Sequence, residues 1–218
     1  MDHVAPDGSP VAVYHRLPAG REPEIIGSAV PPRASLLELG CGTGRVTVPL
    51  TRLGHRVTAV DQSAAMLAEL PQDPGIEPVE ADIERLDLGQ RFDAVILGSH
   101  LLNAPDGVAA RFLATARRHL APDGLALAEV YPAAMDWAAA VGRRSLVGDV
   151  GITVTRASIR GSRLDAAVAY DFDGRTWEQP FEAELLDEDT LRARLLDGGF
   201  AFARWLDEPS GWLAARRR

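Results

Sequence analysis

The chain has 218 residues and a formal net charge of −8, which is enough for one large α/β domain with its own core but short for two. The acidic balance argues against binding to nucleic acid or to an anionic membrane, and favours a small-molecule or protein substrate. All 23 basic residues are arginine, which excludes lysine Schiff bases, pyridoxal phosphate attachment and a P-loop. The single cysteine, Cys41, excludes an intramolecular disulfide and a multi-cysteine metal site, and we expect no metal.

The first segment, residues 1–33, is rich in proline and glycine, with a short apolar stretch at 11–14 and a predicted helix at 22–30. We interpret it as a cap or lid over a ligand site in the main domain, 34–218. The amino terminus lacks a basic region followed by an apolar one, and no run approaches the roughly 18 apolar residues of a membrane span. We therefore predict a cytoplasmic protein, with monomer and homodimer both left open.

A glycine loop follows the first predicted strand. Gly40, Gly42 and Gly44 remove every Cβ from one side of a tight turn, so that a ligand can approach backbone N–H groups at the start of a helix. A dinucleotide motif needs its third glycine at the sixth motif position, which is Arg45 here. The spacing is therefore GxGxG, which counts against a nicotinamide-dependent oxidoreductase. We keep that function only as the weakest hypothesis.

Asp61 ends the second predicted strand, at 56–61, and lies 21 residues after Gly40. Because the carboxyl ends of parallel strands line one crevice of the sheet, its carboxylate can accept hydrogen bonds from both hydroxyls of a ribose. The sequence thus predicts a ribose-containing cofactor.

The run Glu38–Leu39–Gly40–Cys41–Gly42–Thr43–Gly44, followed by Val60–Asp61–Gln62–Ser63, resembles the class I S-adenosylmethionine-dependent methyltransferases. The resemblance covers residues 34–132 well and roughly the last thirty more loosely. It implies S-adenosyl-L-methionine as cofactor and S-adenosyl-L-homocysteine as product. From these motifs it assigns to the cofactor site Glu38, Gly40, Cys41, Gly42, Gly44, Asp61 and Gln62.

Further cofactor residues come from the same resemblance. Asp82, after a third strand, is expected to accept a hydrogen bond from the adenine amino group while Ile83 covers the ring. Met66, on a helix predicted at 63–70 with Ser63 as N-cap, is expected against the adenine, with plain core packing as the alternative. Ser99 lies in the loop after the fourth strand, where the family places the transferred methyl group.

The alternation of strands and helices predicts a doubly wound, mostly parallel seven-stranded α/β sheet. A helix at 106–120 and a turn at 121–124 lead to the fifth strand, 125–131. The pattern then changes, and residues 133–186 are predicted to form an antiparallel insertion that is part of the substrate pocket. Within it we expect a helix at 133–141 and strands at 152–159, 164–172 and 176–185; a helix at 189–196 and strands at 200–206 and 212–215 then end the chain.

Three side chains are candidates for the acceptor side of the site. His100 follows the fourth strand and is the best candidate base, because imidazole titrates near neutrality; packing under the cofactor is its alternative. Tyr131, at the end of the fifth strand, is a candidate for orienting the substrate, or a core residue. Tyr14 is suggested by related enzymes, in which an aromatic residue of the leader lies near the cofactor, or it packs the leader down.

A sulfonium is already an activated methyl donor, so such an enzyme chiefly aligns a nucleophile with the methyl–sulfur bond. We therefore expect methyl transfer to a small-molecule acceptor by in-line displacement. The alternative is a non-catalytic regulatory protein that binds S-adenosylmethionine or S-adenosylhomocysteine with the same residues.

Overall fold

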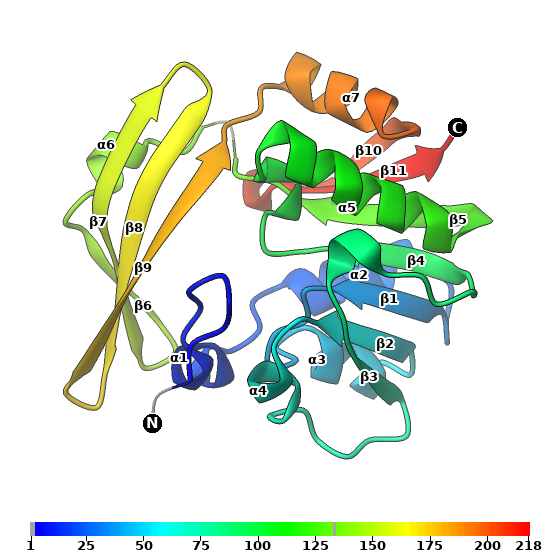
Figure 1. Ribbon diagram of the computed structural model, residues 1–218, viewed down its shortest axis with the longest axis horizontal. Helices are drawn as coiled ribbons and strands as arrows, with labels where there is room; N and C mark the ends of the chain where they lie inside the picture. Colours follow the sequence, from blue (N-terminus) through cyan, green and yellow to red (C-terminus); the bar gives the residue numbers. More distant parts are fainter. Residues whose placement is uncertain (1–2, 133) are drawn as a thin grey trace.

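The computed structural model describes residues 3–132 and 134–218, which form a seven-stranded sheet and a separate four-stranded sheet (Figure 1). The strand order of the larger sheet is β10-β11-β5-β4-β1-β2-β3. Strands β1 to β5 run parallel to one another, and β11 is antiparallel to both β5 and β10, as the predicted fold class requires. Its strands are β1 (Ser35–Leu39), β2 (Arg56–Asp61), β3 (Ile76–Glu80), β4 (Phe92–Leu97), β5 (Leu120–Glu129), β10 (Phe200–Asp207) and β11 (Trp212–Arg217).

Helices cover both faces of this sheet, so its central strands are buried on both sides. On one face Leu36 packs in a cluster with α2 (Glu22–Ala29) and α3 (Thr47–Arg52). On the other face the neighbouring Leu37 packs in a cluster with α5 (Asp106–His119) and α7 (Glu188–Asp197). The remaining helices are short and lie at the carboxyl ends of the strands: α1 (Val11–Arg16), α4 (Ala64–Leu67), η1 (Ile83–Arg85) and η2 (Leu101–Asn103), with η3 (Glu208–Ser210) before β11.

The insertion after β5 has four strands, where three were predicted. Its order is β6-β7-β8-β9, all antiparallel: β6 (Arg144–Val147), β7 (Val150–Arg160), β8 (Arg163–Phe172) and β9 (Arg175–Glu184). The missed strand β6 is an exposed edge strand, so it carries no alternation of buried and exposed residues. The helix predicted at 133–141 is wrong in extent, because α6 spans only Trp137–Ala140; residue 133 lies outside the described residues.

Apart from α6, two elements differ from prediction by three residues or more at one end. Strand β5 begins at Leu120, which pairs with Phe92, and its next paired residue is Leu125 opposite Ala94. Residues 121–124 therefore project from the sheet as a bulge where we predicted a separate turn. Helix α4 ends at Leu67 and is shorter than predicted, although Ser63 does cap it by accepting a hydrogen bond from the Met66 N–H (3.3 Å).

The inserted sheet has an apolar inner face and a charged outer face. Leu164 and Ala166 of β8 lie opposite Ala183 and Phe181 of β9, and all four belong to one apolar cluster. The outer face carries ion pairs such as Arg163–Glu182 (2.7 Å). Side chains alternate along a strand, so the apolar residues share one face and the charged residues the other. The apolar face lies toward the carboxyl ends of the parallel strands (Figure 1).

The chain passes between the two sheets twice, and Asn103, in the turn after β4, hydrogen-bonds the backbone at both places. Its Oδ1 accepts a hydrogen bond from the backbone N–H of Tyr131, where the chain leaves β5 (3.1 Å). Its Nδ2 donates to the backbone carbonyl of Glu184, where the chain leaves β9 (2.7 Å). The side chain is 1% exposed, so these bonds are protected from water.

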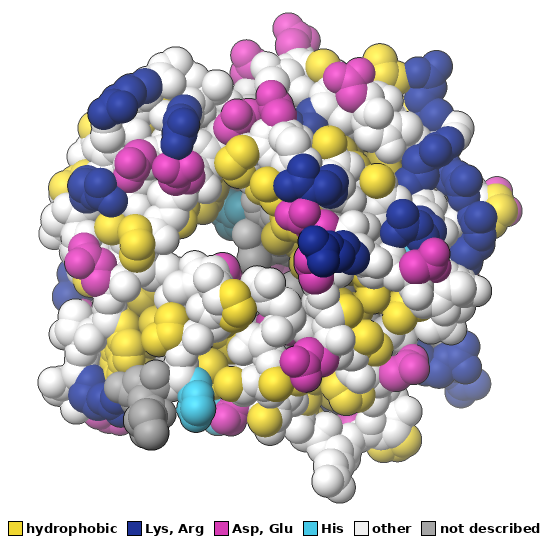
Figure 2. Space-filling view, viewed as in Figure 1, with side chains coloured by type: hydrophobic (Ala, Val, Ile, Leu, Met, Phe, Trp, Pro, Cys, Tyr) yellow, Lys and Arg dark blue, Asp and Glu magenta, His cyan; other side chains and the backbone are white. Residues whose placement is uncertain are grey.

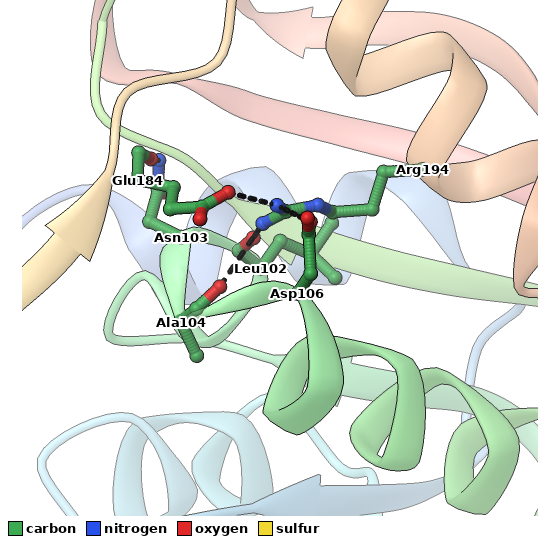
Figure 3. Close-up of polar contacts among 6 residues, drawn as sticks. All are labelled: Leu102, Asn103, Ala104, Asp106, Glu184 and Arg194. Atoms are coloured by element: carbon green, nitrogen blue, oxygen red, sulfur yellow. Dashed lines mark hydrogen bonds and ion pairs between the residues drawn. The ribbon is translucent and has the colours of Figure 1, made fainter. Parts of the chain in front are cut away.

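Arg194 of α7 strengthens the same junction (Figure 3). Its buried guanidinium donates to the carbonyls of Leu102 (2.6 Å) and Ala104 (3.0 Å), and pairs with the carboxylates of Asp106 and Glu184. A guanidinium suits this position because its fork of donors can serve several acceptors at once. The turn after β4, the start of α5 and the end of β9 are therefore held as one unit.

Candidate active site

The glycine loop after β1 is held against β2 by backbone hydrogen bonds. The N–H groups of Gly40 and Cys41 both donate to the carbonyl of Val60 (2.8 and 2.9 Å). Gly40, Gly42 and Gly44 have φ values of +72°, +55° and +85°, which L side chains rarely adopt. A Cβ added at Gly42 would meet nothing within 4 Å, so the backbone there is open to a ligand.

Asp61 joins the glycine loop to the turn that follows β2. Its Oδ2 accepts from the N–H of Gly42 (2.8 Å) and its Oδ1 from the N–H of Ser63 (2.9 Å). Burial raises the pKa of this carboxyl, and the hydrogen bonds from Ser63 and Gly42 act against the shift. Each carboxylate oxygen keeps a lone pair, so Asp61 can accept two further hydrogen bonds.

Glu38 lies beneath the loop in a buried site. Burial raises the pKa of its carboxyl to about 7, while the Thr47 hydroxyl, which donates to Oε2 (2.6 Å), and the charge of Arg45 lower it. Arg45 pairs with Glu22 of α2, and so connects the leader to the glycine loop. Sequence reasoning used Arg45 only as the missing third glycine, and the ion pair with Glu22 gave no local signal.

One cavity of about 710 Å³ extends from the glycine loop to the inner face of the inserted sheet. Figure 2 shows the molecule hollowed at this place. Every site residue named from the sequence lines it except Gly44: Tyr14, Glu38, Gly40, Cys41, Gly42, Asp61, Gln62, Met66, Asp82, Ile83, Ser99, His100 and Tyr131. A Cβ at Gly44 would lie 2.3 Å from Leu70 Cδ2, so this glycine instead lets the loop pack on its neighbour.

Asp82, Ile83 and Met66 form the part of the wall beside β2 and β3. Asp82 Oδ1 accepts the N–H of Glu84 (2.9 Å) and so caps η1, while its Oδ2 lies 3.8 Å from Arg85 Nε; both oxygens keep a lone pair for a further donor. Met66 is 2% exposed and packs with Ala5 and the leader while also lining the cavity. Its two proposed roles, packing and contact with a ligand, are thus compatible.

The turn after β4 contains two successive residues in left-handed backbone conformation, Ser99 (φ +50°) and His100 (φ +62°). Glu129, at the end of β5, holds this turn because its Oε2 accepts the Ser99 N–H (2.9 Å) and lies 3.3 Å from His100 Nδ1. Such strain persists only where the surroundings fix it, and it is common at functional sites. Sequence reasoning missed Glu129, although an acid at the end of a central parallel strand was a usable signal.

Aromatic rings form the wall between the two sheets. The ring of Tyr131 lies 3.8 Å from that of His100 and 4.9 Å from that of Trp137, measured between centroids, and Phe181 of β9 is 6.4 Å away. Burial raises the pKa of the Tyr131 hydroxyl, with the nearby Tyr14 and Glu129 adding to the shift. This phenol therefore stays protonated at neutral pH and can serve as a hydrogen-bond donor.

Sequence reasoning also missed Tyr170 and Gln179 on the inner face of the inserted sheet. Gln179 is 9% exposed, and its side-chain amide contacts Ser9 and Tyr14 of the leader as well as Tyr170. The missed signal is the alternation along β9, which places a glutamine among inward residues.

Comparisons with known proteins agree with this geometry. A family model described as a methyltransferase domain matches residues 36–124. The cypemycin N-terminal methyltransferase of a Streptomyces species is 31% identical over 138 residues, which are 59% of this chain and 56% of that protein. A ubiquinone biosynthesis O-methyltransferase of Methylobacterium nodulans is 34% identical over 103 residues, 42% of this chain and 38% of that protein. The chain thus spans about half the length, or less, of these curated relatives.

Solved structures share the whole fold. The CcbJ methyltransferase of Streptomyces caelestis superposes with a TM-score of 0.75 at 21% identity and covers 95% of both chains. CalS10, an amino pentose methyltransferase of Micromonospora echinaspora solved with S-adenosylmethionine, gives 0.68 at 23% identity over 90% of both chains. The chain therefore has the fold of the class I methyltransferases, with its glycine loop at the carboxyl ends of the parallel strands. Residues 36–124 are similar to the methyltransferase domain family, and the whole chain is similar in fold to S-adenosylmethionine-dependent methyltransferases.

Among residues 3–132 and 134–218, none of the helices is both long and apolar enough to span a membrane.

Proposed function

We propose that the protein transfers a methyl group from S-adenosylmethionine to a small-molecule acceptor. The observation that carries the proposal is the single cavity that joins the glycine loop and Asp61 to an aromatic wall and to the inserted sheet. A donor bound at one end and an acceptor bound at the other would meet beside the turn that holds His100. Bringing the two together in one orientation is the main catalytic requirement.

The residues at the glycine-loop end fit this cofactor. Gly42 leaves open space where a Cβ would stand, and Asp61 has lone pairs for two ribose hydroxyls. We assign Asp82 and Ile83 to the adenine and Glu38 to the amino-acid end. Gln62, Met66, Cys41 and Ser99 complete the wall around these positions.

The cofactor supplies an activated methyl group, and the chain supplies alignment and a place for the acceptor's proton. The carboxylate of Glu129 lies 3.3 Å from Nδ1 of His100, so Nε2 is the ring nitrogen left to take a proton from the methyl acceptor. The carboxylate of Glu129 would then stabilise the imidazolium that forms. Tyr131 is proposed to orient the acceptor through its hydroxyl.

We assign two segments to control of access. Residues 1–33 act as a lid, because Ser9 and Tyr14 reach across the cavity to Gln179 of the inserted sheet. Residues 133–186 act as the acceptor-binding subdomain, whose inner face closes the cavity. Cytoplasmic location and a monomeric or homodimeric state stay predictions; cell fractionation and size-exclusion chromatography with light scattering test them.

Calorimetric titration with S-adenosylhomocysteine, with NAD as control ligand, tests the cofactor assignment. We expect micromolar binding of the first and none of the second. Asp61→Ala should weaken binding, whereas Asp123→Ala, an exposed acid on the bulge of β5, should not. Turnover with a broad acceptor panel then separates an enzyme from a regulatory protein. Binding of NAD alone would refute the proposal.

A further inference from the structure

A chain of polar side chains closes the end of the cavity that is formed by the inserted sheet. The hydroxyls of Tyr14 and Tyr170 each lie 3.3 Å from Gln179 Oε1. Gln179 Nε2 lies 2.9 Å from Ser9 Oγ, and Ser9 Oγ lies 2.9 Å from Asp7 Oδ2. All five residues line the cavity, and they come from the leader, β8 and β9.

The direction of the hydrogen bonds in this series of side chains follows from its last member, the carboxylate of Asp7. A carboxylate can only accept, so the single hydroxyl hydrogen of Ser9 goes to Asp7. Ser9 Oγ must then accept from Gln179, and only the Nε2 side of the amide can donate. The amide oxygen of Gln179 therefore faces the two tyrosines and accepts hydrogen bonds from them. Tyr170 also hydrogen-bonds Tyr14, so both hydroxyl hydrogens are used within this group of three side chains.

This direction decides what the tyrosines offer to a ligand. Each has a single hydroxyl hydrogen, which is already donated to Gln179 or to the other tyrosine, so the oxygens of Tyr14 and Tyr170 present only lone pairs to the cavity. Burial raises the pKa of the Tyr170 hydroxyl, which keeps that hydrogen in place at neutral pH. This end of the cavity thus accepts hydrogen bonds, and its partner must donate them.

The charges on the wall point the same way. Of the arginines in the described part of the chain, only Arg45 lines the cavity, and its charge is paired with Glu22. Six carboxylates lie along the cavity, of which those of Asp82, Glu84 and Glu182 are paired with arginines that lie outside it. Those of Asp7, Glu38 and Asp61 have no arginine ion-pair partner in the described part of the chain and leave this wall with a net negative charge. Aromatic faces and carboxylates together favour a cation over a neutral group or an anion.

We propose that the Tyr14–Tyr170–Gln179 end of the cavity is the acceptor subsite and that it binds a protonated amino group. An ammonium group is a compact cation with hydrogen-bond donors only, which matches the lone pairs of the two tyrosines and the nearby carboxylate of Asp7. The inference rests on the proposed function and names its substrate class, a small-molecule amine. The bound ammonium must lose its extra proton before its nitrogen can attack the methyl group, and the proposed function assigns that proton to Nε2 of His100.

Binding of matched amine and alcohol probes tests the inference. The protein is first saturated with S-adenosylhomocysteine and then titrated with cyclohexylamine and cyclohexanol, and with benzylamine and benzyl alcohol. We expect each amine to bind at least about 10-fold more tightly than its alcohol, since hydrogen bonds to a charged group are the stronger ones. Tyr170→Phe and Asp7→Asn, which keep the shape of each side chain, should each weaken amine binding about 10-fold.

Glu178→Gln is the matched control, because Glu178 lies beside Gln179 on the outer face of β9 and bonds Thr155 (2.8 Å). It removes a negative charge from the same strand and should leave both ligands unaffected. Equal affinities for amine and alcohol, absence of binding by both, or amine affinities unchanged in Tyr170→Phe and Asp7→Asn would overturn the inference. Loss of S-adenosylhomocysteine binding in the parent protein would instead refute the proposed function, so the two failures are distinguishable.

Discussion

Glu38→Gln is expected to change how the stability of the protein depends on pH. Burial raises the pKa of this carboxyl from 4.5 to about 7 in the folded state. The folded chain therefore holds the Glu38 proton more tightly than the unfolded chain does. The stabilising effect is fully present below pH 4.5, declines as pH rises toward about 7, and is lost above that.

The magnitude follows from the size of the shift. One pKa unit corresponds to 1.36 kcal/mol, so a shift to about 7 corresponds to a loss of about 3 kcal/mol of unfolding free energy between pH 4.5 and pH 8. A glutamine has the same shape, can still accept from the Thr47 hydroxyl, and does not ionise. The variant should therefore lack this decline and be more stable than the parent at pH 8.

Urea denaturation of both proteins without ligand, at half-unit steps from pH 4.5 to pH 8.5, measures the difference. Other titrating groups, including Asp61, contribute equally to both proteins and cancel in the comparison. If the two stability curves run parallel across this range, Glu38 is charged in the folded protein and the reasoning from burial is wrong.

Three further variants test the site. Asp61→Ala removes the acceptor for the Gly42 and Ser63 N–H groups and should weaken S-adenosylhomocysteine binding by about 10- to 100-fold; an unchanged dissociation constant in calorimetry would remove Asp61 from the site. His100→Ala should lower kcat far more than cofactor affinity, and equal losses in both would make it a binding residue. Gly44→Ala should cost at least about 1–2 kcal/mol of unfolding free energy, because its φ of +85° disfavours a side chain and the added Cβ would lie 2.3 Å from Leu70 Cδ2; urea denaturation checks this, and a neutral result would contradict the loop geometry.

The main sheet could be predicted because its signals are local. Strands such as Phe92–Leu97 are apolar at every position but one, and the glycine loop has few alternative structures. Strand β6 could not be predicted, since its four residues are exposed and gain their order from pairing with β7. A strand of this kind depends on its partner more than on its own sequence.

The candidate site was predictable where one segment carries the whole pattern, as in the glycine loop and at Asp61. It was not predictable where the function of a residue depends on a distant partner. Glu129 gains its importance from a turn 30 residues earlier, and Gln179 from a leader more than 160 residues away. Position in a strand could mark Glu129 and Gln179 as candidates, but the sequence does not show which distant residue each one contacts.

The anchoring of the inserted sheet through Asn103 has a consequence for enzyme redesign. Asn103 hydrogen-bonds the backbone N–H of residue 131 and the backbone carbonyl of residue 184, and not their side chains. The hairpins β7–β8 and β8–β9 between these two points can therefore be exchanged or diversified without releasing the junction. A library restricted to the inward positions of these strands should vary acceptor choice while the methyl-donor end of the cavity keeps its geometry.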